Sequence, residues 1–222
     1  MYLIYKYHVY YSEMICLNNM TNIENVMFFG VAWYLLNKFF NFIYFYQQYQ
    51  WNSNLVNFTH AIIISTILGT EYMTNTNSNG RNYYFDLSIA FFAYDLINVP
   101  IGSLYFYHHI VSIIGITTIR SSELIDVGKL FLLTFEIGNL PIYIVYIIMK
   151  SGNTYWRNHR FIKHIMIMEL IWYAFFRCFI PIKIVLSINY LPYKMFGMAF
   201  VFASVLWLKG LVKQIINVNN KS

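Results

Sequence analysis

The chain alternates long apolar runs with short polar segments, and this pattern predicts membrane-spanning helices. The apolar runs lie at about 26–46, 55–73, 83–101, 103–119, 127–149, 162–188 and 195–216. Most of them approach the roughly 20 residues that a helix needs to cross a bilayer, and they lack the sustained alternation of barrel strands. Because every backbone N–H and C=O must be paired inside hydrocarbon, we expect an all-α fold, a polytopic integral membrane bundle of six to seven transmembrane helices.

Polar interruptions set the ends of these runs and leave their number open. The first run contains two Asn and one Lys, so it is the weakest span, and without it the count is six. Pro100 and Gly102 separate the third run from the short fourth run, and Pro181 is expected to kink the sixth. The polar stretch TNTNSNGRN at 74–82 is the clearest loop in the chain.

Composition supports a membrane protein and excludes several soluble classes. Charged residues make up 11% of the chain and hydrophobic residues 59%, whereas soluble domains carry about 25% charged residues. So few charges exclude a soluble enzyme, a disordered tail and a coiled coil. Cys16 and Cys178 are too few for a disulfide framework. The net charge of +6 comes from residues between apolar runs, as in membrane anchors, so no nucleic-acid partner is expected.

Lys and Arg set the expected orientation, because short cytosolic loops carry an excess of both. Basic residues around the loop after the fifth run are Lys150, Arg157, Arg160 and Lys163, and those at the C-terminal end of the chain are Lys209, Lys213 and Lys221. The last two apolar runs separate these segments, so both are expected on the cytosolic side. The expected layout is an N-terminal segment at 1–25, a transmembrane domain at 26–216 and a C-terminal tail at 217–222. The side on which the N-terminus lies depends on whether there are six or seven spans.

Ionisable side chains inside the apolar runs are the candidates for function, since a charge at the bilayer centre costs about 2.5–3.5 kcal/mol. They are His60, Asp86, Asp95, His108, His109, Glu136, Glu169 and Arg177, with the polar Asn139 beside them. Asp86 opens the third run, where a first-turn acid that faces water is expected. Asp95 lies nine residues on, about 180° around the helix, so we expect the two acids to face different grooves. Asp95 is the better candidate for a buried interaction.

The adjacent pair His108 and His109 leaves two interpretations open. Their side chains diverge by about 100°, so one can face a cavity while the other packs on a neighbour. Either imidazole can reach the hydroxyl of Ser112 on the same helix. A lone membrane His is more often a packed, hydrogen-bonding residue, but two adjacent His with acids on nearby spans favour a functional pair. Glu136 and Asn139, three residues apart, share one helix face.

Arg177 is expected to pair with an acid from another span, with Glu136 and Asp95 as candidates, and such an ion pair would pin the bundle. Glu169 is eight residues away, too far for a direct ion pair within the helix, although Tyr173 lies between them. The sequence has no His-x-x-x-His pattern, nucleophile elbow or Gly-rich phosphate loop. We therefore expect no metal site and no cofactor.

Three consecutive runs carry a family resemblance: FFAYDLINV (91–99), YFYHHIVSIIGI (105–116) and GKLFLLTFEIGNLPIYI (128–144). In them an Asp-bearing span is followed by a double His and then by a span with a Glu. With a His-bearing span entry at 51–69 and an Arg-bearing span at 173–182, this order resembles the TLC-domain family. That family consists of multi-pass membrane proteins and includes ceramide synthases. The resemblance covers about 45–216.

Ceramide synthases carry a longer motif, with which this chain agrees in part. The motif runs His-His-x-x-Thr, then Gly-x-Leu about 20 residues on, then His-Asp-x-x-Asp. Laid on this chain without a gap, it falls on His108, His109, Ser112, Gly128, Leu130, Phe135, Glu136 and Asn139. The first His pair and the Gly-x-Leu are kept, whereas the third His is Phe, one Asp is Glu and the other is Asn. The resemblance is therefore closer to the members outside the ceramide-synthase branch.

The resemblance implies a protein that binds, senses or moves lipids, in an endomembrane such as the endoplasmic reticulum. The implied lipid-binding residues are His108, His109, Ser112, Glu136 and Asn139, and the structural polar residues are Asp95, Arg177 and His60. Membrane lipids are the expected partners. Two alternatives stay open. One is a ceramide-synthase-like N-acyltransferase that uses acyl-CoA, with His108, His109 and Glu136 as catalytic candidates. The other is a structural partner of other membrane proteins.

Overall fold

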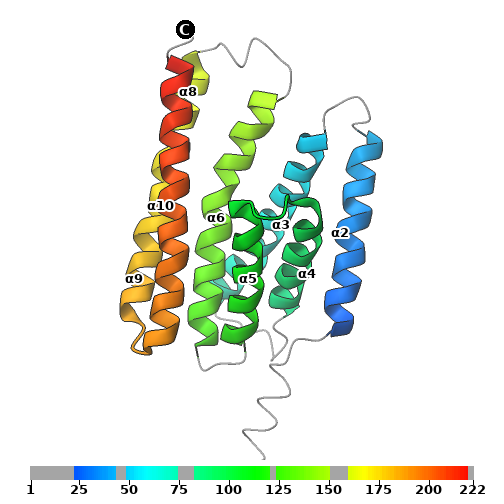
Figure 1. Cartoon of the computed structure of the whole chain (residues 1–222), viewed down its shortest axis with the longest axis vertical. Coiled ribbons are helices and arrows are strands. Elements are labelled where there is room, and N and C mark those ends of the chain that lie inside the picture. Colours follow the sequence, from blue (N-terminus) through cyan, green and yellow to red (C-terminus); the bar gives the residue numbers. More distant parts are fainter. Residues whose placement is uncertain (1–22, 44–48, 75–82, 121–123, 151–159, 220–222) are drawn as a thin grey trace, which may run out of the picture. The chain divides into compact units, whose positions relative to one another are not determined.

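A computed structural model describes residues 23–43, 49–74, 83–120, 124–150 and 160–219, and nearly all of them are helical (Figure 1). The helices are α2 (Ile23–Ile43), α3 (Tyr49–Thr74), α4 (Tyr83–Asn98), α5 (Leu104–Arg120), α6 (Ile125–Lys150), α8 (Arg160–Tyr173), η1 (Ala174–Phe179), α9 (Ile180–Ser187) and α10 (Leu191–Asn219). Helices α8, η1 and α9 follow one another without a break. No strand occurs in these ranges, so the predicted all-α class is confirmed.

Three helical segments are long and apolar enough to cross a membrane, judged by length and composition. They are Ile125–Lys150, Phe161–Ser187 and Leu191–Asn217, and they match the last three predicted runs. The earlier runs are also helical where described, but α4 and α5 have only 16 and 17 residues. At 1.5 Å per residue they rise about 24–26 Å, which is short of the roughly 30 Å hydrocarbon core. Six to seven spans therefore stay a prediction.

Contacts divide the chain into two compact units, which are described separately. The first unit comprises Met1–Lys38 and Ile67–Lys129, and the second comprises Phe39–Thr66 and Leu130–Ser222. The first unit therefore holds most of α2, the end of α3, the whole of α4 and α5, and the start of α6. The second unit holds the greater part of α3 and α6 together with α8, η1, α9 and α10.

In the first unit, α4 and α5 form a hairpin whose turn lies at the interruption that the sequence predicted. The turn contains Pro100 and Gly102, and Gly102 has a φ of 85°, a conformation that glycine adopts without strain. The Ser103 backbone N–H donates to the Pro100 carbonyl at 3.1 Å. The Ser103 hydroxyl accepts a hydrogen bond from the Phe106 backbone N–H at 3.1 Å, so Ser103 caps the start of α5. The predicted interruption is confirmed, and it places α5 antiparallel beside α4.

Helix α4 is the buried centre of the first unit. Every residue from Tyr84 to Phe92 is buried. On α2, Trp33 is also buried, and its indole N–H donates to the Leu87 carbonyl at 3.3 Å. The Trp33 ring packs edge-on against Phe91 with 5.5 Å between ring centroids. These contacts fix α2 against α4, and the loop predicted at 74–82 lies outside the described residues apart from Thr74, the last residue of α3.

In the second unit, the sixth predicted span is one helix with a π-helical stretch in its middle. The Ile180 backbone N–H donates to the Phe175 carbonyl, five residues back, where an α-helix bonds four residues back. Pro181 follows in the first turn of α9. Inside an α-helix a Pro ring clashes with the carbonyl four residues back. The wider π turn gives this ring room, so the kink predicted at Pro181 takes the form of a π-helical stretch.

Helices α6, α8 and α10 meet at one end of the second unit. Val145, Ile162 and Met166 form a buried apolar cluster, and Ile215 packs against it. Ile162 is near the start of α8 and Ile215 near the end of α10, so these two helices run antiparallel (Figure 1).

The outer faces of these helices carry exposed large apolar side chains. Examples are Ile171, Phe175, Phe179, Leu186 and Phe202, each about half exposed or more. Water solvates so much exposed apolar surface poorly, whereas hydrocarbon solvates it well.

Candidate functional site

Polar side chains are buried inside the helices of both units, and most of them contact another polar group. The buried ionisable residues are His60, Asp86, Asp95, His109, Arg120, Lys129, Glu136, Glu169 and Arg177. A buried charge without a partner is costly, so the partner of each residue indicates its role.

His109 of α5 and Asp95 of α4 form a buried imidazole–carboxylate pair in the first unit. His109 Nε2 lies 2.9 Å from Asp95 Oδ2, and both residues are 3% exposed. The α4–α5 hairpin brings them together, and the predicted buried interaction of Asp95 is confirmed. His109 Nδ1 is enclosed and has no hydrogen-bond partner among the described residues. The carboxylate lies close to Nε2, although the two groups do not have the geometry of a hydrogen bond, and Nδ1 stays available to one further polar group.

His108 diverges from His109 as the helical spacing predicts. Its ring is half-buried and meets Phe92 of α4 nearly perpendicularly, with 6.2 Å between ring centroids. Phe92 also contacts the His109 ring at 5.3 Å. Ser112, one turn further along α5, is buried. One imidazole thus faces a carboxylate while the other packs on an aromatic neighbour.

Asp86 corrects a prediction, because it is 1% exposed and does not face water. Its carboxylate forms an ion pair with the Arg120 guanidinium at the end of α5. The Asn25 side-chain amide on α2 donates to the same carboxylate at 3.3 Å. Asp86 and Asp95 therefore both pair with α5, although they lie on opposite sides of α4. A long Arg side chain can reach farther around a neighbouring helix than an imidazole, and this length allows Arg120 to pair with Asp86.

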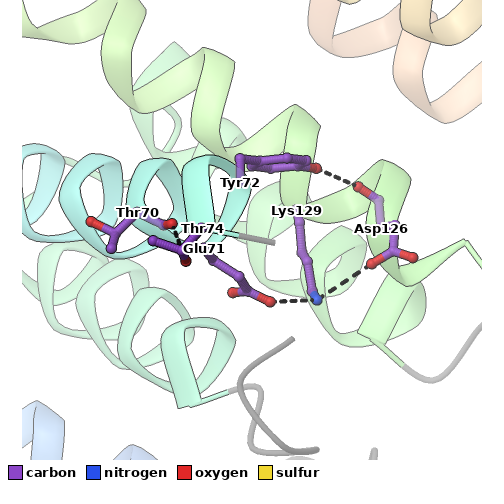
Figure 2. A network of polar contacts seen from close by, with 6 residues as sticks. All are labelled: Thr70, Glu71, Tyr72, Thr74, Asp126 and Lys129. Atoms are coloured by element: carbon purple, nitrogen blue, oxygen red, sulfur yellow. Dashed lines mark hydrogen bonds and ion pairs between the residues drawn. The ribbon is translucent and has the colours of Figure 1, made fainter. Parts of the chain in front are cut away.

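A second polar network in the first unit joins the end of α3 to the start of α6 (Figure 2). Lys129 Nζ lies 2.9 Å from Glu71 Oε1 and 3.3 Å from Asp126 Oδ1. The Tyr72 hydroxyl donates to the Asp126 backbone carbonyl at 3.1 Å. Sequence analysis missed this network and the Asp86–Arg120 pair. The spacing of three residues between Asp126 and Lys129 was the available signal, since such residues are neighbours on a helix.

In the second unit, His60 of α3 faces Glu136 of α6. His60 Nδ1 lies 3.6 Å from Glu136 Oε2, and both side chains are buried. Asn139, one turn further along α6, is half-buried. This is a second buried imidazole–carboxylate pair.

Arg177 of η1 is 3% exposed and is surrounded by aromatic rings. Its Cζ lies 4.2 Å from the ring centroid of Phe135 and 5.7 Å from those of Tyr173 and Trp207. Among the described residues of the second unit, no carboxylate lies within ion-pair distance of the guanidinium. The predicted pairing with Glu136 is therefore wrong. Glu136 faces His60 instead, and the negative faces of the rings attract the cation.

Two features of the sequence place the Arg177 side chain: one leaves space for it and the other keeps it on the buried face of its helix. Gly138 of α6 lies against it, since a Cβ added there would be 2.5 Å from Arg177 Cγ. The buried residues Glu169, Tyr173, Arg177 and Pro181 are each four residues apart, a spacing that would drift about 120° around an α-helix. The π-helical stretch takes up this drift and keeps Arg177 on the buried face.

The predicted lipid-binding residues are divided between the two units. His108, His109 and Ser112 belong to the first unit, and Glu136 and Asn139 belong to the second. The structure gives His109 and Glu136 separate partners, Asp95 and His60. In the part of the chain that the structure describes, no three His, Cys, Asp or Glu side chains gather as metal ligands. Comparisons with protein-family models, curated proteins and solved structures find no match to this chain.

Proposed function

We propose that this chain is a multi-pass, TLC-domain-like membrane protein that binds, senses or moves lipids within the bilayer of an endomembrane such as the endoplasmic reticulum. Three apolar helical segments and exposed apolar side chains support a membrane setting. The order of Asp, double-His, Glu and Arg spans supports the likeness to that family. Six to seven helices would cross the bilayer in this proposal.

The observation that carries the proposal is the His109–Asp95 pair. Both groups are buried between helices that otherwise carry large apolar side chains, and His109 Nδ1 lacks a partner among the described residues. Burying a polar atom without a hydrogen bond costs about 1–3 kcal/mol. A residue that only packs would gain nothing from this arrangement. A lipid hydroxyl, amide or ester oxygen that meets Nδ1 would complete its hydrogen bonding.

Crosslinking tests the proposal with a photoactivatable lipid added to membranes that contain the protein. We expect labelling of the wild type and a several-fold loss in His109→Gln. His164→Gln is the matched control, because His164 is exposed on α8. Equal labelling of all three proteins, with His109→Gln reduced only in thermal stability, would assign His109 to packing and overturn the proposal.

A second candidate function is N-acyl transfer from acyl-CoA to a sphingoid base or similar amine. The same pair favours it, since a general-base imidazole commonly has a carboxylate beside it. The amine nitrogen would attack the thioester carbonyl, His109 would take the proton of the amine, and the CoA thiol would leave with that proton. Acyl-CoA and a sphingoid base supplied to purified protein should then yield an amide, and Asp95→Asn should slow the reaction. Lipid binding without any amide product leaves the first proposal and removes this one.

A further inference from the structure

Arg177 carries a positive charge in the middle of an apolar helix, and the described residues of the second unit place no anion beside it. It lies near the centre of the segment Phe161–Ser187 and is 3% exposed. No carboxylate of the described second unit lies within ion-pair distance of the guanidinium, and Glu169 on the same helical segment is not paired with it. Buried charges in proteins are paired or hydrogen-bonded, so this guanidinium is incomplete as it stands.

The aromatic rings around Arg177 offset its charge but leave at least its Nε–H donor without an acceptor among the described residues. Attraction between a cation and aromatic rings is strongest over the ring faces, and Phe135 is the closest ring at 4.2 Å. A guanidinium has five N–H donors, all in its own plane. The Nε atom is buried and has no hydrogen-bond partner among the described residues. The planar edge of Arg177 therefore remains able to bind two oxygens side by side.

Two hydroxyls lie next to the guanidinium. The buried Tyr173 hydroxyl faces both Arg177 and Ser204 of α10. The Ser204 hydroxyl donates to the Phe200 carbonyl at 3.0 Å. The Tyr173 hydroxyl, by contrast, makes no well-formed hydrogen bond among the described residues, so its proton is available to a ligand. A guanidinium edge beside a phenol is a donor set suited to an anionic oxygen group.

We propose that Arg177 and Tyr173 bind the anionic head group of a membrane lipid, a carboxylate or a phosphate monoester. The inference rests on the proposed function, and it names a class of lipid and a site in the second unit. A lipid is favoured over a free anion because the site lies midway along an apolar helix. Phe175 and Phe179, on the same helical stretch, expose about half of their side chains, so an acyl chain would find apolar contacts there.

Binding to the purified protein in neutral detergent tests the proposal. The probes are oleate and phosphatidic acid, with oleyl alcohol and diacylglycerol as neutral partners of the same chain type and inorganic phosphate as a free anion. We expect each anionic lipid to bind about tenfold or more tightly than its neutral partner, as loss of a charge-assisted hydrogen bond implies. Arg177→Gln should abolish this preference, and Arg177→Lys should keep part of it because the charge remains.

Lys183→Gln is the matched control, because Lys183 is an exposed cation over the Phe179 ring on the same helical segment. It should leave the preference unchanged. If Arg177→Gln fails to fold, the wild-type protein alone tests the proposal. The thermal unfolding temperature of the wild type should rise more with oleate than with oleyl alcohol. Equal affinity for anionic and neutral lipids overturns the site but leaves lipid binding intact. Inorganic phosphate that binds as tightly as phosphatidic acid overturns the assignment to a lipid, and absence of all lipid binding removes the proposed function too.

Discussion

Asp86 and Asp95 show what decides the place of a buried charge at the scale of single residues. The sequence predicted a buried interaction for Asp95 because it lies deep in its run, one turn before the Pro100 turn. It did not predict the burial of Asp86, since a first-turn acid fits water and an ion pair equally well. The partner that settles the matter, Arg120, is 34 residues away along the chain. Arg120 and Asp86 come together only when the α4–α5 hairpin folds, so their pairing cannot be read from local sequence.

We expect Asp86→Ala to destabilise the protein strongly, because it leaves the Arg120 guanidinium buried without its carboxylate. Breaking a buried ion pair costs about 3–5 kcal/mol. Asp126→Ala is the control, since its side chain is 80% exposed and exposed ion pairs contribute about 0–1 kcal/mol. Thermal unfolding in detergent measures both. The double change Asp86→Leu with Arg120→Leu should recover most of the loss, and a double variant no more stable than Asp86→Ala would contradict the pairing.

At the scale of elements, the sequence predicted where the helices lie better than it predicted their internal geometry and their contacts with other helices. Pro181 indicated a disturbance in the sixth span, but not that it would be a π-helical stretch. Nor did the pattern predict that Arg177 would meet aromatic rings, because the residues involved come from α6, η1 and α10. Spacing along one helix predicts a face and not the residues of other helices that contact it.

The π-helical stretch should tolerate the loss of one residue. Deleting the half-exposed Phe175 would leave the buried positions of this helix three and four residues apart, which is α-helical spacing. We expect the deletion variant to fold with an unfolding temperature close to wild type but to lose the anionic-lipid preference. Deleting the exposed Met168 from the regular α8 should instead rotate all later residues by about 100° and destabilise strongly. Equal losses from both deletions would contradict this account of the π-helical stretch.

At the scale of the whole molecule, the sequence predicted an all-α fold and the positions of the three helical segments that are long and apolar enough to cross a membrane. The sequence did not fix the number of spans. Helices α4 and α5 are short, and length alone does not say whether they cross a bilayer. The sequence also did not predict which of the candidate site residues would contact one another. His109 and Glu136 were both expected to bind lipid, yet each has a carboxylate or imidazole partner within its own unit.

The ends of α6 and α10 should lie on the same side of the membrane. The apolar cluster of Val145, Ile162 and Met166 with Ile215 joins these ends, and the basic residues nearby predict the cytosolic side. The test is labelling of single cysteines in sealed vesicles, with Cys16 and Cys178 replaced by Ser. Cysteines at Lys150 and Asn217 should react from the cytosolic side, and a cysteine at Asn189, in the connection between α9 and α10, should react from the other. Lys150 and Asn217 on opposite sides would contradict the arrangement, and both on the lumenal side would contradict the orientation.

The central claim is that polar groups buried in this helical protein bind lipid, and native mass spectrometry of the wild-type protein tests it most directly. The protein would be extracted from its membrane into mild neutral detergent, washed free of loosely held lipid, and measured intact with its bound molecules. The account predicts a discrete adduct of lipid mass, and dissociation of that adduct should release an anionic lipid. A protein that carries no lipid under conditions that keep it folded would contradict the account.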